Sequence, residues 1–364
     1  MVVDEVRPDG LREPAMGWVC VLVEHDDTGF LGVHYNPLRR SGLKTVFTRT
    51  FILSIKMGDS EAAWSNFSLA PENEPLVSIV IPTHLRAPKL AATLAAIHAQ
   101  DYENAEVVVV ATPDADTERI LRTPLCDELD ATVVVQETSG VSEARNIALE
   151  YATGDIVAFT DDDCVPPPDW VSGIVAVFDA YDVVTTGGMQ LPHERVYNRF
   201  PARVDESRIL RNQLPHRRDR DDNGVAVGGM ELRTFATSNV AYRRTAIEET
   251  SASFDETLHR GEDATFQRTV LEAYPEGNAF LPIPVWHNRD YTLRQFLDQR
   301  YRNGIAESGT PDGRSFMGSI AGIALAPLLL ARSIHREDSL STAICAWIGD
   351  VTARIGVGVG TLRN

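Results

Sequence analysis

The stretch that decides the fold reads Ile156-Val157-Ala158-Phe159-Thr160-Asp161-Asp162-Asp163. Its first half is an apolar run typical of a buried strand, and its second half places three carboxylates directly behind that strand. Carboxylates this close repel one another, so we expect a hard divalent cation and a phosphate ligand to neutralise them. The bland alternative is a solvated acidic turn. The stretch favours metal-dependent chemistry on a nucleotide-linked substrate.

Strands and helices alternate on the N-terminal side of this stretch. The sequence predicts strands at residues 77–81, 107–110, 133–135 and 156–159, the first of them ending at Pro82. It predicts helices at residues 87–100 and 114–121, and a third that Ser142 caps and Gly154 stops. This alternation predicts an α/β, Rossmann-like, mostly parallel sheet flanked by helices, in which ligands bind at the carboxyl ends of the strands.

The pattern loosens after Val183. Residues 193–224 are rich in Arg, Asp, Pro and Asn, and we expect a long polar excursion there. A regular pattern resumes at residues 235–243. A helix is predicted at 262–273, and Thr292 is expected to cap another helix.

Composition excludes several classes of protein. A chain of 364 residues with a formal net charge of −18 does not suit nucleic acid as its main partner. Lysine occurs only at positions 44, 56 and 89, and this acidic, lysine-poor composition favours a halophilic archaeon, the alternative being an ordinary acidic enzyme. The four cysteines have no CxxC spacing, which argues against a zinc site or a disulfide framework and fits a reducing cytoplasm.

We expect three regions: an N-terminal extension and linker at residues 1–74, a catalytic domain at 75–310 and an apolar helical region at 311–364. Residues 1–56 hold seven acidic and seven basic side chains, so the whole net charge lies beyond them. They fit either a weakly structured extension read from an early start or a small subdomain. The first residues lack the basic and apolar segments of a signal peptide, and none is expected.

The C-terminal region is apolar but broken. Residues 316–331 carry no charge, yet as a helix they would span only about 24 Å, short of the roughly 30 Å hydrocarbon core. Asp350 and Arg354 interrupt the next apolar stretch, 343–362. We expect this region to lie in the membrane interface, or to pack on the catalytic domain or a partner, rather than to span a membrane.

A second acidic motif, Gly261-Glu262-Asp263, follows about a hundred residues after the first. Three further segments accompany the two motifs: Val77-Ser78-Ile79-Val80-Ile81-Pro82-Thr83-His84-Leu85-Arg86, Gly140-Val141-Ser142-Glu143-Ala144-Arg145-Asn146, and Pro168-Asp169-Trp170 behind the acidic cluster. In this order and spacing they resemble the family 2 glycosyltransferases, over about residues 76–305. The resemblance implies the GT-A fold, a nucleotide-sugar donor and an inverting single displacement.

The resemblance also implies a site. A departing nucleoside diphosphate develops negative charge, which a bound Mg²⁺ or Mn²⁺ stabilises. Asp163 and His287 match positions that hold the metal, with Asp162 beside them, and Asp161 matches a contact to the donor's ribose or base. The nucleotide-sugar-binding candidates are Pro82, Thr83, His84, Arg86, Asp114, Asp116, Arg145, Asp161 and Asp162. Arg145 also fits a surface arginine, and His287 a structural histidine.

Asp263 matches the family's catalytic base, and Glu262 is expected to orient the acceptor. Asp263 is expected in the first turn of a helix, where the helix dipole favours the ionised carboxylate that a base needs. The alternative is that Asp263 only compensates the charge at the start of the helix. Ser238, Asn239 and Arg302 are the candidates for the acceptor side. Arg302 lies in Gln299-Arg300-Tyr301-Arg302, which is similar to the acceptor motif of processive members but lacks its tryptophan.

One departure stands out. Most relatives place a base-reading Asp after the second strand, where this chain has Ala111, and Asp114 and Asp116 follow in the same turn. The base of the nucleotide therefore stays open between uracil, guanine and thymine.

We expect an inverting glycosyltransferase that moves a hexose from a nucleotide-diphosphate sugar to a lipid-linked (polyprenyl or dolichyl) or glycan acceptor. This activity suits protein glycosylation or cell-surface polysaccharide assembly, in the cytoplasm or peripherally at the inner face of the cell membrane. A sugar-nucleotide pyrophosphorylase is disfavoured, since residues 82–90 contain no glycine to hold a triphosphate. A non-catalytic nucleotide-sugar-binding subunit of a glycan assembly complex remains the alternative.

Overall fold

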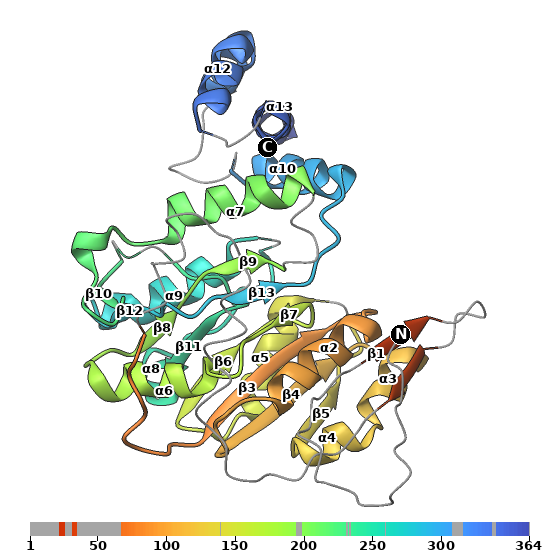
Figure 1. Ribbon diagram of the computed structural model, residues 1–364, viewed down its shortest axis with the longest axis vertical. Helices are drawn as coiled ribbons and strands as arrows, with labels where there is room; N and C mark the ends of the chain where they lie inside the picture. Colours follow the sequence, from red (N-terminus) through yellow and green to blue (C-terminus); the bar gives the residue numbers. More distant parts are fainter. Residues whose placement is uncertain are drawn as a thin grey trace, which may run out of the picture. The chain divides into compact units, whose positions relative to one another are not determined.

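A computed structural model describes residues 22–25, 31–34, 67–138, 140–193, 199–230, 232, 234–258, 260–307, 316–336 and 340–363 (Figure 1). The chain divides into two compact units, residues 1–46 and 47–364. In the first unit, β1 (Leu22–His25) and β2 (Leu31–His34) pair antiparallel, with Leu22 opposite His34. The rest of the expected extension, residues 1–56, lies outside the described residues.

Within the described part of the second unit, the main sheet has eight strands in the order β10-β12-β8-β11-β6-β3-β4-β5. Their bounds are β3 (Val77–Thr83), β4 (Ala105–Ala111), β5 (Ala131–Val135), β6 (Ile156–Phe159), β8 (Thr185–Gly187), β10 (Ala226–Gly228), β11 (Val240–Arg243) and β12 (Asn278–Phe280). Strands β6, β3, β4 and β5 are parallel neighbours, whereas β11 runs antiparallel to both β6 and β8. The predicted α/β, mostly parallel sheet is confirmed.

The parallel strands bring their carboxyl ends to one edge of the sheet. Every residue of β3 is buried, as expected for a strand covered on both faces. Strand β3 runs two residues beyond its predicted end, because Pro82 pairs in register with Val110 and Thr83 with Ala111. The acidic stretch follows β6 at this same edge, where ligands bind in such sheets.

Helices follow the strands in most of the predicted places. They are α2 (Ala87–His98), α3 (Ala115–Leu121), α4 (Pro124–Glu128), α5 (Val141–Tyr151), α6 (Trp170–Ala180), α7 (Phe200–Gln213), α8 (Arg244–Thr250), α9 (Glu262–Ala273) and α10 (Leu293–Glu307), with a 3₁₀ turn at Arg217–Asp219. Thr292 caps α10 as predicted, since its hydroxyl accepts from the Gln295 amide at 3.2 Å.

Two local predictions were wrong. Gly140, not Ser142, is the N-cap of α5, and Ser142 is buried inside the first turn. The expected polar excursion at 193–224 contains the fourteen-residue helix α7, whose apolar residues are too few to reveal it in the sequence. Two of them, Ala202 and Val204, are nonetheless buried.

A second sheet, in the order β7-β13-β9, lies beyond the main one. It comprises β7 (Cys164–Val165), β9 (Gln190–Pro192) and β13 (Val285–His287). Strand β13 pairs antiparallel with β7, so that His287 faces Cys164 in register. This pairing carries His287 from more than a hundred residues away to the acidic stretch.

An aromatic cluster packs beneath the ends of β6 and α9. Phe159 on β6 contacts the ring of Phe266 on α9 edge-on, with centroids 6.2 Å apart. Phe266 stacks on Phe254 at 4.2 Å and meets Tyr242 of β11 at 5.1 Å. All four side chains are buried, and each buries a large apolar area. The cluster therefore fixes the two acidic motifs relative to each other, because each motif follows or precedes one of these rings by a few residues.

The C-terminal region forms α11 (Phe316–Ala324), α12 (Ala326–Arg336) and α13 (Leu340–Arg363). The chain breaks between α11 and α12 at Leu325, two residues before Pro327, whose ring suits the first turn of a helix. Within the described residues, α13 alone has the length and apolar composition that crossing a membrane requires, over Leu340–Leu362. One face of α13 is buried, and an added Cβ at Gly356 would overlap the carbonyl oxygen of Tyr301 on α10.

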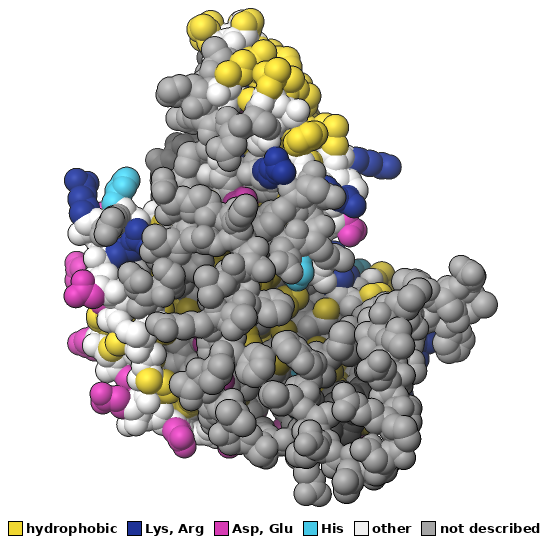
Figure 2. All heavy atoms as spheres, in the orientation of Figure 1, with side chains coloured by type: hydrophobic (Ala, Val, Ile, Leu, Met, Phe, Trp, Pro, Cys, Tyr) yellow, Lys and Arg dark blue, Asp and Glu magenta, His cyan; other side chains and the backbone are white. Residues whose placement is uncertain are grey.

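The outer side of these helices carries an apolar surface. We define the C-terminal apolar surface by its exposed members Ile320, Ile323, Leu325, Leu328, Ile334 and Leu340. Figure 2 shows hydrophobic side chains gathered over α12 at the top of the view, with basic side chains directly beneath them. Side chains of this type, exposed together, mark a contact with a membrane or a partner.

The close approach of the α5–β6 turn to β3 gives a first test. A Cβ at Gly154 would lie 2.6 Å from the Leu76 carbonyl oxygen and 2.7 Å from the Ser78 amide nitrogen, both backbone atoms. We expect Gly154→Ala to lower the free energy of unfolding by about 1–3 kcal/mol, as overpacking does. Urea unfolding would measure it. Gly140→Ala is the control, because its methyl group would meet only atoms of Glu143, none of them closer than 3.5 Å; equal losses would contradict the packing argument.

Candidate active site

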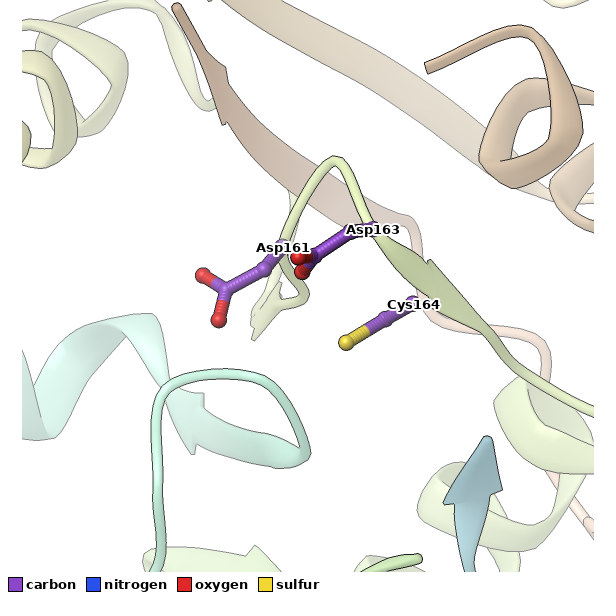
Figure 3. A group of neighbouring side chains, drawn as sticks. All are labelled: Asp161, Asp163 and Cys164. Atoms are coloured by element: carbon purple, nitrogen blue, oxygen red, sulfur yellow. The ribbon is translucent and has the colours of Figure 1, made fainter. Parts of the chain in front are cut away.

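The acidic stretch forms a short loop between β6 and β7. Asp161, Asp163 and Cys164 each offer a ligand atom, and these atoms all lie within 4.8 Å of one another. Figure 3 shows the three side chains projecting to the same side of the loop. Burial raises the pKa of the Cys164 thiol well above its usual value, so the thiol stays protonated. The two carboxylates are therefore the groups that fit a hard cation such as Mg²⁺ or Mn²⁺.

Cationic side chains already surround Asp163. Arg86 Nη1 lies 3.2 Å from one carboxylate oxygen, Lys89 Nζ lies 3.8 Å from it, and His287 Nε2 lies 3.3 Å from the other oxygen. Burial opposes the ionised form of Asp163, but the hydrogen bond from His287 and these charges together lower its pKa below the usual value. Asp163 is a carboxylate kept ionised in a buried place, as a cation ligand must be.

Asp162 shares the Arg86 guanidinium with Asp163 and also contacts the end of β3. Its carboxylate accepts from the Thr83 hydroxyl at 2.8 Å and from Arg86 Nη1 at 3.0 Å. Burial raises the pKa of Asp162 to about 6, although the charge of Arg86 opposes the shift. The Thr93 hydroxyl donates to the carbonyl oxygens of Asp162 and Cys164, which fixes the loop from α2.

Arg145 joins the two acidic motifs. Its guanidinium donates through Nη2 to Asp161 Oδ1 at 3.1 Å and through Nη1 to Glu262 Oε1 at 3.0 Å. The side chain of Arg145 is only 4% exposed, and it lies over the Phe254 ring at 5.4 Å from the centroid. A buried cation thus holds together carboxylates that are a hundred residues apart in the chain.

The second motif begins α9. Gly261 precedes the helix with a φ of +83°, a left-handed conformation that favours glycine. Glu262 and Asp263 then occupy the first turn, where the helix dipole favours their ionised forms. Burial, and then the charge of Glu262, raise the pKa of Asp263 above its usual value. A raised pKa makes this carboxylate a stronger base when it is ionised.

The remaining donor-side candidates lie around the ends of β3 and β4. Pro82 is buried within β3, and His84 is exposed, with its Nδ1 3.0 Å from the Thr112 hydroxyl. Asp114 is the N-cap of α3 and accepts from the Asp116 and Thr117 amides. Asp116 pairs with Arg119 one turn along the same helix, at 3.1 Å. Asp114 and Asp116 thus hold the first turn of α3, and Asp114 Oδ2 is buried without a hydrogen-bond partner among the described residues.

The acceptor-side candidates separate into buried and exposed groups. Asn239 is fully committed to the core, because it accepts from Trp170 Nε1 at 2.8 Å and donates to the Met189 and Ile283 carbonyl oxygens. Ser238 is also buried, and its hydroxyl has no hydrogen-bond partner among the described residues. Arg302 is exposed on α10 and pairs with Asp298 at 2.8 Å. The side-chain amide of Asn239 thus has all its described hydrogen bonds inside the core.

Sequence reasoning missed two neighbours of Asp163. Lys89 follows Arg86 by three residues in the first turn of α2, and the scarcity of lysine in the chain was the signal that could have singled it out. Tyr291 lies with its hydroxyl 3.4 Å from His287 Nδ1, on the ring nitrogen opposite the one that meets Asp163. The sequence carried no signal for that contact.

The family model described as glycosyl transferase family 2 matches residues 78–250. Succinoglycan biosynthesis protein ExoM of Rhizobium meliloti is 31% identical over 248 residues, which cover 64% of this chain and 74% of that protein. The chain belongs to glycosyl transferase family 2. The matched region includes the acidic stretch and Arg145, whereas Glu262 and Asp263 lie just beyond it.

A glucosyl-dolichyl phosphate glucuronosyltransferase of Haloferax volcanii is 26% identical over 190 residues, covering 51% of this chain. The chain spans 58% of that relative's length. Among solved structures, a mannosyltransferase of Pyrobaculum calidifontis in complex with GDP-Man and Mn²⁺ aligns with a TM-score of 0.50 and 20% identity. The alignment covers 82% of this chain and 90% of that one. This likeness establishes the GT-A fold.

The buried position of Arg145 gives a second test. Arg145→Met would leave Asp161 and Glu262 without their partner, and removing one member of a buried ion pair costs about 3–5 kcal/mol of stability. Thermal unfolding would measure the loss. Arg122→Met is the control, since Arg122 is 79% exposed and pairs only within its own surface turn. A drop no larger than that of the control would show that the bridge contributes little.

Proposed function

We propose that the protein is a metal-dependent, inverting glycosyltransferase that moves a hexose from a nucleotide-diphosphate sugar to a lipid-linked or glycan acceptor. One observation carries this proposal: Arg145 holds Asp161, on the donor side, against Glu262, whose neighbour Asp263 is the candidate base. A transferase needs a leaving-group site and a base close together, on opposite sides of one sugar carbon. The membership of the family supports the same reading.

On the donor side, Asp163, with Asp161 and His287 beside it, would hold Mg²⁺ or Mn²⁺. The ion would supply positive charge to the departing diphosphate. Arg86 and Lys89 add two cations at the same place, and they can turn from Asp163 to phosphate oxygens. Thr83 and Asp162 position Arg86, and His84 offers a ring at the edge where the base of the nucleotide would lie.

On the acceptor side, Asp263 would accept the proton of the attacking hydroxyl. Its burial holds the carboxylate in an environment that raises its basicity, and Glu262 is held in place by Arg145. The hydroxyl attacks the anomeric carbon as the bond to the diphosphate breaks. A single displacement of this kind inverts the configuration at that carbon.

The acceptor and the location follow from the C-terminal region. The C-terminal apolar surface suits peripheral contact with the inner face of the cell membrane, where a polyprenyl- or dolichyl-linked acceptor would be reached. The name of the Haloferax relative, which acts on glucosyl-dolichyl phosphate, supports such an acceptor. That relative's source and the acidic, lysine-poor composition together support a halophilic origin.

Replacing the candidate base gives the central test. We expect Asp263→Asn to lower the rate of nucleoside diphosphate release about 10²- to 10⁴-fold, the usual contribution of a general base, with donor binding unchanged. Release would be measured in high salt with UDP-, GDP- and dTDP-sugars, Mg²⁺ or Mn²⁺, and a glycosyl polyprenyl phosphate acceptor, whose sugar supplies the attacking hydroxyl. Glu272→Gln, an exposed carboxylate near the end of the same helix, is the control.

Two results would contradict the proposal. Full turnover in the Asp263→Asn variant would remove Asp263 from the base position. Sugar-nucleotide binding without release in the wild type, across all donors, would favour the non-catalytic binding subunit, for which the alanine at position 111 is the first structural reason.

The membrane contact has its own test. The double variant Leu325→Glu, Leu328→Glu puts two charges on the C-terminal apolar surface, and both sites are more than half exposed. We expect its binding to phosphatidylglycerol vesicles to fall about tenfold or more, since each buried Leu contributes roughly 1.5–3 kcal/mol. Co-sedimentation would measure this. Val135→Glu alters an exposed apolar residue on β5 and serves as the control; equal binding by all proteins would place the membrane contact elsewhere.

A further inference from the structure

A buried tyrosine lies next to the candidate metal ligand His287. Tyr291 is only 5% exposed, and its hydroxyl lies 3.4 Å from His287 Nδ1. The other ring nitrogen of His287, Nε2, lies 3.3 Å from Asp163 Oδ1. The two aromatic rings meet edge to face, with their centroids 6.0 Å apart. Tyr291 thus contacts the imidazole at the nitrogen that does not contact Asp163.

The backbone of Tyr291 adopts a conformation that is unusual for a bulky residue. Its φ is +47°, in the left-handed region that favours glycine. Such a conformation is unfavourable, persists only where the surrounding contacts impose it, and is found mainly at functional sites. A glycine would fit this backbone without strain, so the reason for a tyrosine at this position lies in its side chain.

Helix α7 and the residues around it hold Tyr291 in place. The carbonyl oxygen of the preceding residue, Asp290, accepts from Arg199 Nη1 at 2.6 Å, and Arg199 is the N-cap of α7. The Tyr291 ring packs with Ala202 in the first turn of the same helix. The guanidinium of Arg289 lies over this ring, 5.9 Å from its centroid. These contacts fix the ring and, with it, the position of the hydroxyl.

A histidine that binds a cation needs a partner for its second ring nitrogen. Nε2 of His287 can bind a cation only through its lone pair, so the ring proton must then be on Nδ1, and that N–H requires an acceptor. Without a cation, Nε2 can instead donate to Asp163, and Nδ1 then requires a donor. A tyrosine hydroxyl both donates and accepts hydrogen bonds. Tyr291 therefore suits Nδ1 in both states, which a backbone carbonyl or an amide N–H could not do.

We propose that Tyr291 is a positioning residue of the metal site, whose hydroxyl holds the His287 ring in the orientation in which Nε2 binds Mg²⁺ or Mn²⁺ beside Asp163. This inference rests on the proposed function and deepens it, because the metal site is part of that proposal. It also gives the polar helix α7 a role, since the first turn of α7 supports the ring of Tyr291. The metal site then extends one layer beyond the residues that would contact the ion.

Removing the hydroxyl alone tests the inference. Tyr291→Phe keeps the ring that packs with Ala202 and loses the contact to Nδ1. Mn²⁺ would be titrated into the full chain, with and without UDP or GDP, and the free ion followed by electron paramagnetic resonance. We expect the variant to bind Mn²⁺ about 10- to 100-fold more weakly, the usual loss when the outer partner of a metal-bound histidine is removed. Electron spin echo modulation of bound Mn²⁺ should show a directly bonded imidazole nitrogen in the wild type and a weaker signal in the variant.

A double variant separates positioning from general damage to the fold. If Tyr291 acts through His287, adding Tyr291→Phe to His287→Ala should weaken Mn²⁺ binding by less than about twofold beyond His287→Ala alone, since the two losses are then one. Tyr102→Phe is the matched control, because its hydroxyl also makes a hydrogen bond, to the Pro75 carbonyl oxygen at 2.7 Å. It should bind Mn²⁺ like the wild type.

Four results would each overturn the inference: no Mn²⁺ binding by the wild type, no imidazole signal, unchanged affinity in Tyr291→Phe, or single losses that multiply in the double variant. These readouts need no turnover, so they are independent of the transferase assay. If Mn²⁺ binding depends on Tyr291 but no donor releases its diphosphate, the proposed function fails and the positioning role stands. If transfer occurs while Tyr291→Phe binds Mn²⁺ like the wild type, only the inference fails.

Discussion

The buried guanidinium of Arg145 is the constraint on which the site depends. It cannot lose its charge, and it is almost completely excluded from water, so it requires carboxylates on both sides. Asp161 and Glu262 meet that need, and in doing so they bring the end of β6 to the start of α9. The aromatic rings of Phe159, Phe254 and Phe266 fill the space beneath them. The packed rings fix the distance between the two acidic motifs. The charge of Arg145 requires that the side chains beside it be carboxylates.

Both sides of the site neutralise charge by pairing opposite signs. Around Asp163, carboxylates and cations alternate, and each buried charge has a partner of opposite sign. On the other side, Glu262 accepts from the buried guanidinium of Arg145. These ion pairs fix the positions of the carboxylates.

The elements that the sequence predicted well share a strong local signal. Strands β3 and β6 are continuous apolar runs, and α9 has both an apolar period and acidic residues in its first turn, so its predicted bounds agree with the structure. Helix α7 lacks such a period because most of its residues are polar, and its packing against other elements decides its state. At α5, a serine that suits an N-cap is instead the second residue of the helix, where its side chain is buried.

The residues of the candidate site also differ in whether the sequence could predict them. Motif residues such as Arg145, Asp161 and Asp163 could be named from the sequence because their spacing follows a family. Contacts that depend on three-dimensional packing could not be predicted from the sequence. Lys89 on α2 lies beside Asp163, and the side chain of Asn239 makes its hydrogen bonds inside the core.

Helices α10 and α13 touch where both lack side chains. An added Cβ at Gly304 would overlap the carbonyl oxygen of Ala353, and Gly349 meets the ring of Phe296 in the same way. Each glycine weakens an isolated helix by about 1 kcal/mol relative to alanine. Helix α13, which holds glycines at positions 349, 356, 358 and 360, would therefore be a poor helix as a free peptide. Its folding depends on α10 being present, so a chain shortened before residue 340 would expose the face of α10 that carries Phe296 and Gly304.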